Sequence, residues 1–343
     1  MPRQAVFMVG LVLAGSGILA AGPLQEQAAS KEPSPPAAIP LSRLTADAVI
    51  PLAFEPGAVA VADGLWVPQP ASGSVVKVDA KRNTVGQPVH VGGEPCASLV
   101  HAFDSLWVPL CGAEGGLLRL PDPKPADPKP EARSPEPEAR SPKPAFPSIA
   151  SAVGSIWLVT DRKGVVARVD PDTNAPVAEI YVPRGAASVN SGSGLFSGAD
   201  ALWVTSEEAG RLTRVNPHNN VVEEEIRVGP KPVRLAVGEG GVWTLNGDGT
   251  VTRVDPKANK VVATIALGVD TTRGDIAAGA GSVWVSVPGA PVVRIDPRTN
   301  RATHRFTGEG GGAILVAHGS LWVNAGAKAT WRLDPRLVEA VRP

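Results

Sequence analysis

A tryptophan-bearing string that recurs along the chain constrains the fold more than any other feature of this sequence. It reads small residue, apolar residue, Trp and then usually Val, and it occurs at Trp66, Trp107, Trp157, Trp203, Trp243, Trp284 and Trp322. Consecutive copies are 41, 50, 46, 40, 41 and 38 residues apart. This is the period of one four-stranded propeller blade and is longer than a leucine-rich or β-helix coil. The seven copies therefore predict an all-β, seven-bladed β-propeller.

A second string follows each tryptophan, as in VTRVDPKAN before residue 260. β-Branched residues alternate with a basic residue, which is typical of a strand with one buried face. The Asp-Pro-x-x-Asn ending, for example Asp255 to Asn259, is turn chemistry, because Asp accepts from the backbone ahead, Pro presets its own φ and Asn tolerates a positive φ. A further β-rich run and a short run before the next Trp complete four antiparallel strands per period.

The two ends of the repeat predict how the ring closes. The last repeat stops near Val338, before any outer strand, whereas residues 48–54 (AVIPLAF) resemble an outer-strand string and precede the first Trp. A single blade cannot bury both of its faces, so the blades must stack around an axis. We expect the propeller to span residues 44–338, with the N-terminal strand closing the last blade.

The second blade departs from the pattern. Residues 121–147 form a Pro-rich, low-complexity insertion that occupies outer-strand space, so we expect three good strands there. A docking or wall-spanning role and simple drift are the alternatives for the insertion. Cys96 and Cys111 flank a hairpin turn at Phe103-Asp104, and their positions predict that they face each other and form a disulfide.

The N-terminal residues indicate export. Arg3 precedes an apolar stretch that ends at Ala20 and Ala21, so residues 1–21 read as a signal peptide and residues 22–43 as a Pro/Ala-rich linker. An uncleaved anchor is the alternative. No other segment is long and apolar enough to span a membrane, so we expect a secreted or periplasmic protein without a transmembrane domain after signal removal.

The charge balance limits the classes of partner. The chain has 33 Lys and Arg against 33 Asp and Glu, so its formal net charge is zero. Nucleic-acid binding and binding to anionic membranes both depend on bulk positive charge, so we expect neither. The expected partner is a small molecule or a protein at one propeller face, and we expect a monomer.

The combination of Gly-apolar-Trp-Val, Arg-Val-Asp-Pro-x-x-Asn and a Gly/Pro corner resembles the YVTN-type and virginiamycin B lyase-like propellers over residues 44–338. For the lyase, the resemblance implies a channel-mouth His and Glu pair with magnesium, the Glu standing three residues past a repeat Trp. This chain has no Glu at those positions, which hold Gln69, Leu110, Thr160, Ser206, Asn246, Val287 and Ala325. The resemblance carries the fold and fails at the catalytic residues, so the catalytic residues are unknown.

The loops at the channel face supply the candidate site residues. Lys231, Arg234, Arg273 and Asp275 lie in the corners of two adjacent blades and would suit an anionic ligand. The alternative is an Arg234–Asp275 ion pair that tightens the channel mouth. Acidic residues follow the Trp strands on the same face and offer oxygen ligands for Ca²⁺ or Mg²⁺, with solvated loop charges as the alternative. They are Asp161, Glu207, Glu208 and Asp248.

These observations favour an exported binding or interaction module with its ligand or partner at the channel face. The alternative is a lyase-like enzyme for C–O bond elimination, with a rearranged and metal-dependent mouth. No phosphate loop and no nucleophile with an adjacent base occur in the sequence. A divalent cation is the one cofactor that the loop residues suggest.

Overall fold

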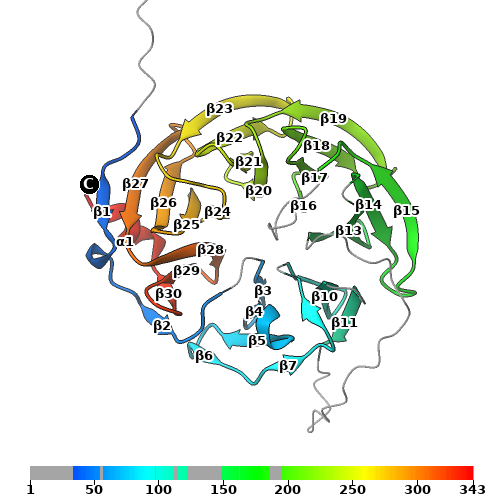
Figure 1. Ribbon diagram of the computed structural model, residues 1–343, viewed down its shortest axis with the longest axis horizontal. Helices are drawn as coiled ribbons and strands as arrows, with labels where there is room; N and C mark the ends of the chain where they lie inside the picture. Colours follow the sequence, from blue (N-terminus) through cyan, green and yellow to red (C-terminus); the bar gives the residue numbers. More distant parts are fainter. Residues whose placement is uncertain are drawn as a thin grey trace, which may run out of the picture. The chain divides into compact units, whose positions relative to one another are not determined.

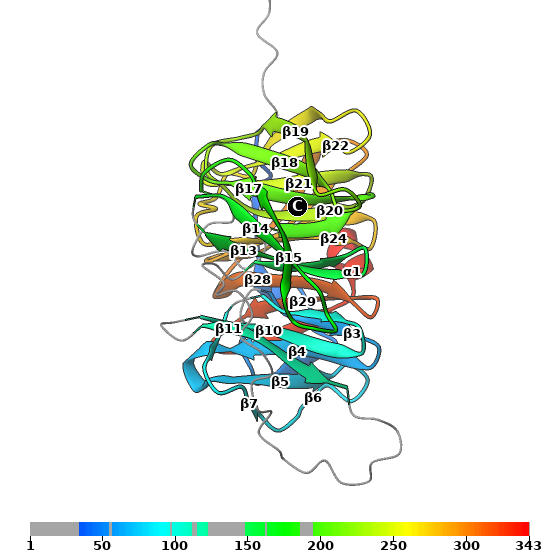
Figure 2. The ribbon, with the colours of Figure 1, turned by 90° about the vertical axis from the view of Figure 1, so that its right-hand side faces the viewer.

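The computed structural model describes residues 34–54, 57–96, 98–111, 115–122, 148–161, 163–185 and 195–342. The expected signal peptide, most of the expected linker and most of the Pro-rich insertion lie outside these residues. The described part forms seven β-sheets arranged as a ring of blades (Figure 1). Figure 2 shows the ring edge-on, with blades 4 and 5 at one end and blade 1 at the other. The prediction of an all-β, seven-bladed propeller is confirmed.

Each blade is an antiparallel meander that runs from the centre of the ring to its rim. The inner strands are β3 (Val59–Val61), β8 (Glu94–Pro95) with β9 (Val100–Ala102), β12 (Ile149–Ala152), β16 (Leu195–Gly198), β20 (Pro232–Gly238), β24 (Asp275–Gly279) and β28 (Gly310–Ala317). The second strands carry the repeat Trp and are β4 (Gly64–Gln69), β10 (Ser105–Cys111), β13 (Ser155–Asp161), β17 (Ala201–Ser206), β21 (Gly241–Asn246), β25 (Ser282–Val287) and β29 (Ser320–Ala325).

The third strands carry the basic residue of the repeat. They are β5 (Ser74–Asp79), β11 (Gly116–Pro121), β14 (Val165–Val169), β18 (Arg211–Asn216), β22 (Thr250–Asp255), β26 (Ala290–Asp296) and β30 (Thr330–Leu333). The outer strands form the rim and are β6 (Thr84–Val85) with β7 (Val89–His90), β15 (Pro176–Tyr181), β19 (Val221–Arg227), β23 (Lys260–Ala266), β27 (Arg301–Thr307) and β2 (Ala48–Ile50).

The ring closes as the sequence predicts. Strand β2 pairs antiparallel with β30, with Val49 opposite Trp331, so the N-terminal strand completes blade 7. The seam is reinforced by Asn324, whose side chain donates to the Phe54 carbonyl at 2.7 Å and accepts from the Phe54 N–H at 2.8 Å. The first and last parts of the chain therefore share one sheet.

The propeller extends beyond both ends of the expected range 44–338. Strand β1 (Ala38–Pro40) pairs in parallel with β27 and adds a fifth strand to blade 6, and a short 3-10 turn follows at Leu41–Arg43. Ile39 and Leu41 are buried against the blade 6–7 core, which is why these residues belong to the propeller and not to a linker. A short helix, α1 (Pro335–Ala340), follows the last strand.

Blade 2 has three strand positions among its described residues, and residues 123–147, which the sequence places in its outer-strand space, lie outside those residues. β8 and β9 both pair with β10 as an interrupted inner strand, and β11 pairs with the other side of β10. Within the described ranges no strand pairs with the outer edge of β11. In the register of blade 2, Pro121 stands opposite Ser105, at the position where blade 1 has Asp79 opposite Gly64.

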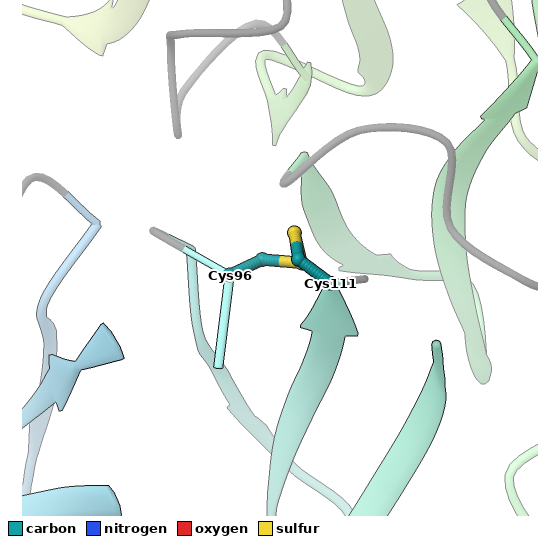
Figure 3. The surroundings of a disulfide bond; sticks show 2 residues. All are labelled: Cys96 and Cys111. Atoms are coloured by element: carbon teal, nitrogen blue, oxygen red, sulfur yellow. A yellow bond between two sulfur atoms is a disulfide. The ribbon is translucent and has the colours of Figure 1, made fainter. Parts of the chain in front are cut away.

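The Cys96–Cys111 disulfide is present, with the two Cα atoms 5.3 Å apart (Figure 3). The hairpin turn at Phe103-Asp104 is also as predicted, but the register shifts by two residues along the hairpin. His101 lies opposite Leu106, whereas Cys111 lies opposite Glu94 and not opposite Cys96. The Cys96 N–H donates to the Pro109 carbonyl at 2.7 Å, so Cys96 stands two register positions from Cys111 and the disulfide crosses the two strands diagonally.

The apolar core is divided among the junctions between neighbouring blades. At each junction the repeat Trp of one blade packs against the strands of the next, as Trp243 of blade 5 does against Val283 and Val293 of blade 6. Six of the seven repeat tryptophans are fully buried, and Trp66, at the junction of blades 1 and 2, is only partly buried. Burial of indole between blades supplies much of the free energy that holds the ring together.

Candidate functional site

The basic residue of the repeat is a structural latch between blades. In every blade it stands directly opposite the repeat Trp in the sheet register, as Arg253 stands opposite Trp243. The Arg253 guanidinium lies 4.9 Å from the indole centroid and donates to the carbonyl of Pro297 and to Oδ1 of Asn300, both in the next blade's turn. Arg168, Arg214 and Arg332 likewise donate to a carbonyl and to the Asn Oδ1 of the next blade's turn, and Arg119 donates to the Pro171 carbonyl of blade 3.

The Asp-Pro-x-x-Asn turn is shaped to receive this latch. Asp255 Oδ1 accepts hydrogen bonds from the N–H groups of Lys257 and Ala258, and Asn259 ends the turn at a φ of 54°. The left-handed Asn presents its side-chain oxygen to Arg214 of the preceding blade. The same backbone hydrogen bonds lower the pKa of the Asp255 carboxyl. The recurring spacing of the Asp-Pro-x-x-Asn string is therefore a requirement of the fold. Its Asp side chain is hydrogen-bonded within the turn, and its Asn side chain binds the arginine of the preceding blade.

Two junctions replace the latch with other contacts. At the junction of blades 1 and 2, Lys77 stands in the Arg position and pairs with Asp63 of its own blade at 2.8 Å. At the junction of blades 6 and 7, Arg294 pairs at 2.7 Å with Glu339, which belongs to α1. The C-terminal helix therefore takes the place of a turn in closing blade 7 onto blade 6.

The channel face of the propeller is formed by the loops that enter the inner strands and by those that join the second and third strands. There the structure brings Arg234 and Asp275 together. Both side chains are about 95% buried, with Arg234 Nε 3.9 Å from Asp275 Oδ1 and donating to the Gly274 carbonyl at 3.1 Å. The Asp275 carboxylate also accepts from the N–H groups of Ile276 and Ile314. One buried pair thereby links blades 5, 6 and 7.

Burial dominates the electrostatics of this pair. Removal from water raises the pKa of the Asp275 carboxyl, and the Arg234 charge and two backbone N–H groups oppose that shift. Burial lowers the pKa of Arg234 while Asp275 opposes the change. Both charged groups are buried, so a ligand in solution would contact the exposed side chains of the same corners and not the pair itself.

Lys231 and Arg273, the other two predicted site residues, are exposed on the channel face. Lys231 precedes β20 and adopts a φ of 49°, and its carbonyl accepts from the N–H of Gly247. Arg273 stands two residues before β24 in the loop whose Thr271 is fully buried. The exposed cations thus sit in corners fixed by backbone hydrogen bonds, three residues before Arg234 and two residues before Asp275.

The acidic candidates on the channel face lie in three separate blades. Asp161 accepts from the Lys163 N–H, and Asp248 accepts from the Thr250 hydroxyl and N–H, so both carboxylates cap their own turns. Glu207 lies in the next blade from Asp161, and Glu208 is exposed beside it. Within the ranges that the structure describes, no three His, Cys, Asp or Glu side chains gather where they could hold a metal ion.

Four of the five histidines lie away from the channel face, and the fifth, His90, is exposed on the rim strand β7 opposite Ser74. His101 pairs with Asp122 at 2.8 Å, and His318 contacts the Gly64 carbonyl from a hairpin tip of blade 7. His304 is buried beneath the C-terminal tail, where Nε2 is 2.8 Å from the Val341 carbonyl, and burial lowers its pKa. His90 and His218 lie on an outer strand and in an Asp-Pro-type turn. The geometry needed for a His-assisted elimination at the channel mouth is therefore not assembled by these side chains.

Sequence reasoning placed Arg234 and Asp275 in adjacent corners but missed two partners. The Ile314 N–H, which binds Asp275 from blade 7, is a backbone group and leaves no residue-type signal. Glu339, which binds Arg294, lies past the expected end of the propeller. A signal did exist for the latch, because a basic residue recurs two positions before every turn.

Solved structures share this fold at low sequence identity. BamB from Moraxella catarrhalis is 12% identical and matches with a TM-score of 0.61, covering 85% of this chain and 99% of that one. The WD40 domain of Neurospora crassa Pan2 is 9% identical, with a TM-score of 0.62 over 82% and 90% of the chains. The WD40 β-propeller domain of Doa1 is 13% identical, with a TM-score of 0.62 over 84% and 96%. At these identities the likeness shows the fold alone.

No protein-family model and no curated protein sequence matches the chain. In the part of the chain that the structure describes, no helix has the length and apolarity needed to cross a membrane.

Proposed function

We propose that this chain is an exported interaction module that binds an anionic ligand or an acidic segment of a partner protein at the channel face. The observation that carries the proposal is the exposure of Lys231 and Arg273 in the same two corners that hold the buried Arg234–Asp275 pair. The pair fixes the corners of blades 5, 6 and 7, so the two exposed cations are preorganised without loss of loop entropy on binding. Lys and Arg held at fixed positions suit carboxylate or phosphate groups.

The experiment is a calorimetric titration of the folded protein with a hexaglutamate peptide and, separately, with inorganic phosphate. We expect binding that the Lys231→Ala/Arg273→Ala variant weakens by about tenfold or more, since charge-assisted hydrogen bonds are lost. The matched control is Lys260→Ala/Arg301→Ala, which removes two exposed cations from outer strands. Equal affinity of the two double variants for both probes would exclude the channel-face site.

Export is the second part of the proposal. The Cys96–Cys111 disulfide supports it, because such bonds persist in oxidising compartments. The apolar stretch that ends at Ala21 supports it as well. Mass spectrometry of the protein from extracellular or periplasmic fractions should find a mature N-terminus close to residue 22 and no free thiol. Recovery of the intact, reduced chain from the cytoplasm would contradict export.

We also infer that the blades are of the YVTN and virginiamycin B lyase-like repeat type. The support is the Gly-apolar-Trp-Val string together with the Arg-Val-Asp-Pro-x-x-Asn string. In this chain the residues of the two strings form the contacts between neighbouring blades, so the inferred relationship to these repeats is one of architecture. Incubation with a streptogramin depsipeptide should leave its ester bond intact with and without magnesium, and ring opening would favour the lyase alternative.

A further inference from the structure

The face opposite the channel face has a feature that neither the repeat nor the proposed function explains. The tips that join inner and second strands are two-residue turns, and in six blades both residues are left-handed, with φ between 46° and 76°. This conformation suits Asn, Asp and Gly, and it is costly for β-branched and bulky residues. The first residues of these six turns are Phe103, Val153, Ala199, Glu239, Ala280 and His318.

Two neighbouring tips therefore carry side chains that the turn disfavours. Phe103 in blade 2 has a φ of 55° and Val153 in blade 3 has a φ of 46°. Both side chains are also exposed, at 38% and 41%, so burial does not offset the backbone strain. Strained residues that contribute nothing to the core point to a function in recognition. We call the surface formed by Phe103 and Val153 the tip patch.

The tip patch is rigid, because two latch arginines hold its backbone. Arg119 Nη2 donates to the Phe103 carbonyl at 3.4 Å, while Arg119 Nη1 donates to the Pro171 carbonyl of blade 3 at 2.8 Å. Arg168 holds the Val153 carbonyl in the same way at 3.4 Å. The inner strands β9 and β12, which lead to the two tips, lie side by side in the ring. Apolar side chains presented from fixed positions can act as binding anchors.

Among the residues that the structure describes, the exposed charges around the tip patch are mostly acidic. Asp104 is the second residue of the blade 2 tip, and Asp172 lies in the blade 3 turn that Arg119 contacts; both are exposed. Asp122 lies beside them, 42% exposed, and pairs with His101. The guanidinium groups of Arg119 and Arg168 donate to backbone carbonyls and to the hydroxyls of Ser105 and Ser155. An apolar centre with an acidic rim is complementary to apolar side chains flanked by Lys or Arg.

We propose that the tip patch is a second interaction surface, which docks a basic, apolar segment of a partner protein on the face opposite the proposed anionic site. Phe103 and Val153 supply the apolar contact, and Asp104 and Asp172 select for positive charge. A propeller with one cationic and one acidic docking face can hold two different partners at once. The inference does not depend on the channel-face site, since it uses other blades and the other face.

The test separates strain from recognition by substituting residues at equivalent turn positions. Phe103→Asn/Val153→Asn removes the patch and places a residue that tolerates the left-handed turn. Ala199→Asn/Ala280→Asn makes the same backbone change in blades 4 and 6, where no large apolar side chain is present. Both double variants should melt about 2–4 °C higher than the wild type, because the turn strain is relieved.

The binding probe is a 12-residue peptide of alternating Leu and Lys, with a peptide of alternating Leu and Glu as its charge-reversed match.

We expect the Leu-Lys peptide to bind the wild type and the Ala199→Asn/Ala280→Asn control equally, and the Phe103→Asn/Val153→Asn variant about tenfold or more weakly. Asp104→Asn/Asp172→Asn should weaken binding and reduce its dependence on salt. Equal binding by the wild type and the Phe103→Asn/Val153→Asn variant overturns the proposal. Dimerisation of the wild type in sedimentation velocity, lost in that variant, also overturns it, because the occupant would then be a second copy of this chain.

Discussion

Arg253 and Asn300 join two blades through a single hydrogen bond, in which Arg253 Nη1 donates to Asn300 Oδ1 at 2.8 Å. The arginine lies on the third strand of blade 5 and stacks on Trp243 of its own sheet, and the asparagine closes the turn of blade 6. Every group in this contact belongs to the sequence repeat. The repeat therefore encodes contacts between successive blades as well as the strands within each blade.

Replacing Arg253 with Ala should destabilise the protein by about 2 kcal/mol. The change removes the stacking contact with Trp243 and three hydrogen bonds from a charged donor, which individually contribute about 1–3 kcal/mol. Urea denaturation measures the effect, and Arg301→Ala, at an exposed outer-strand position, is the matched control. In a double-mutant cycle with Asn300→Ala the coupling energy should be at least about 0.5 kcal/mol. A coupling energy near zero would contradict the latch.

The Cys96–Cys111 disulfide should contribute substantially to the stability of the ring, because it lies at the junction of blades 1 and 2. The junction of blades 1 and 2 has Lys77 in place of the latch arginine, and Trp66 is only partly buried there. Cys96→Ala/Cys111→Ala should lower the free energy of unfolding by about 3 kcal/mol, the chain-entropy value for a loop of this length.

Hydrogen exchange can locate the effect of removing the disulfide. Amides of β4 and β10 should lose protection in the double variant, whereas those of β21 and β25, on either side of the latched junction of blades 5 and 6, should keep it. Uniform loss of protection around the ring would show that the junction of blades 1 and 2 is no weaker than the others.

Acid should destabilise the ring through the repeat turns that begin with Asp, which read Asp-Ala in blade 1 and Asp-Pro in blades 3 and 5. Hydrogen bonds from backbone N–H groups lower the pKa of Asp79, Asp170 and Asp255 below that of an unfolded Asp. A carboxyl whose pKa is lowered on folding stabilises the protein above its unfolded pKa, and the stabilisation is lost as the pH falls through the folded pKa. The loss is therefore expected on acidification below about pH 4.

Changing the three turn aspartates to Asn should flatten this acid dependence and still allow folding. Asn216 shows why, since it occupies the same turn position in blade 4 and its Oδ1 accepts from the His218 N–H at 2.9 Å. The melting temperature between pH 5 and pH 2 is the measurement. Glu179→Gln/Glu224→Gln/Glu225→Gln removes three carboxylates from outer strands and is the control. A triple Asn variant as acid-sensitive as the wild type would mean that the turns do not set the acid limit.

The sequence predicts the features of this fold that recur in every blade, and it predicts few of the features that occur once. Trp spacing sets the blade number, and the Asp-Pro-x-x-Asn string sets the turns, because each uses a local backbone preference repeated in every blade. Strand β1 escaped prediction because Ala38–Pro40 is short, lies next to a Pro-rich stretch and pairs in parallel with a strand far along the chain. Neither property leaves a periodic signal.

At the candidate site the sequence predicts proximity but not burial. Arg234 and Asp275 occupy equivalent places in adjacent blades, so their approach follows from the repeat. Their exclusion from water depends on how Ile314 and Gly274 pack around them, which residue types do not reveal. The tip patch was missed for a related reason, since Phe103 and Val153 oppose the preference of the turn that they occupy.

Removing Arg234 should be among the most damaging single changes on the channel face. Arg234→Ala leaves the Asp275 carboxylate buried without its counter-charge, which costs about 3–5 kcal/mol, whereas Arg234→Met/Asp275→Leu should cost less because no buried charge remains. The pKa of Asp275, which burial already raises, should rise further in Arg234→Ala, because the arginine that opposes the shift is gone.

A carboxyl with a raised folded pKa stabilises the protein below its unfolded pKa and loses that stabilisation as the pH rises. The stability gap between Arg234→Ala and the wild type should therefore be smaller at pH 4 than at pH 7 in urea titrations. A gap that stays constant or widens at pH 4 would show that the lost arginine packing, and not the unpaired carboxylate, accounts for the damage.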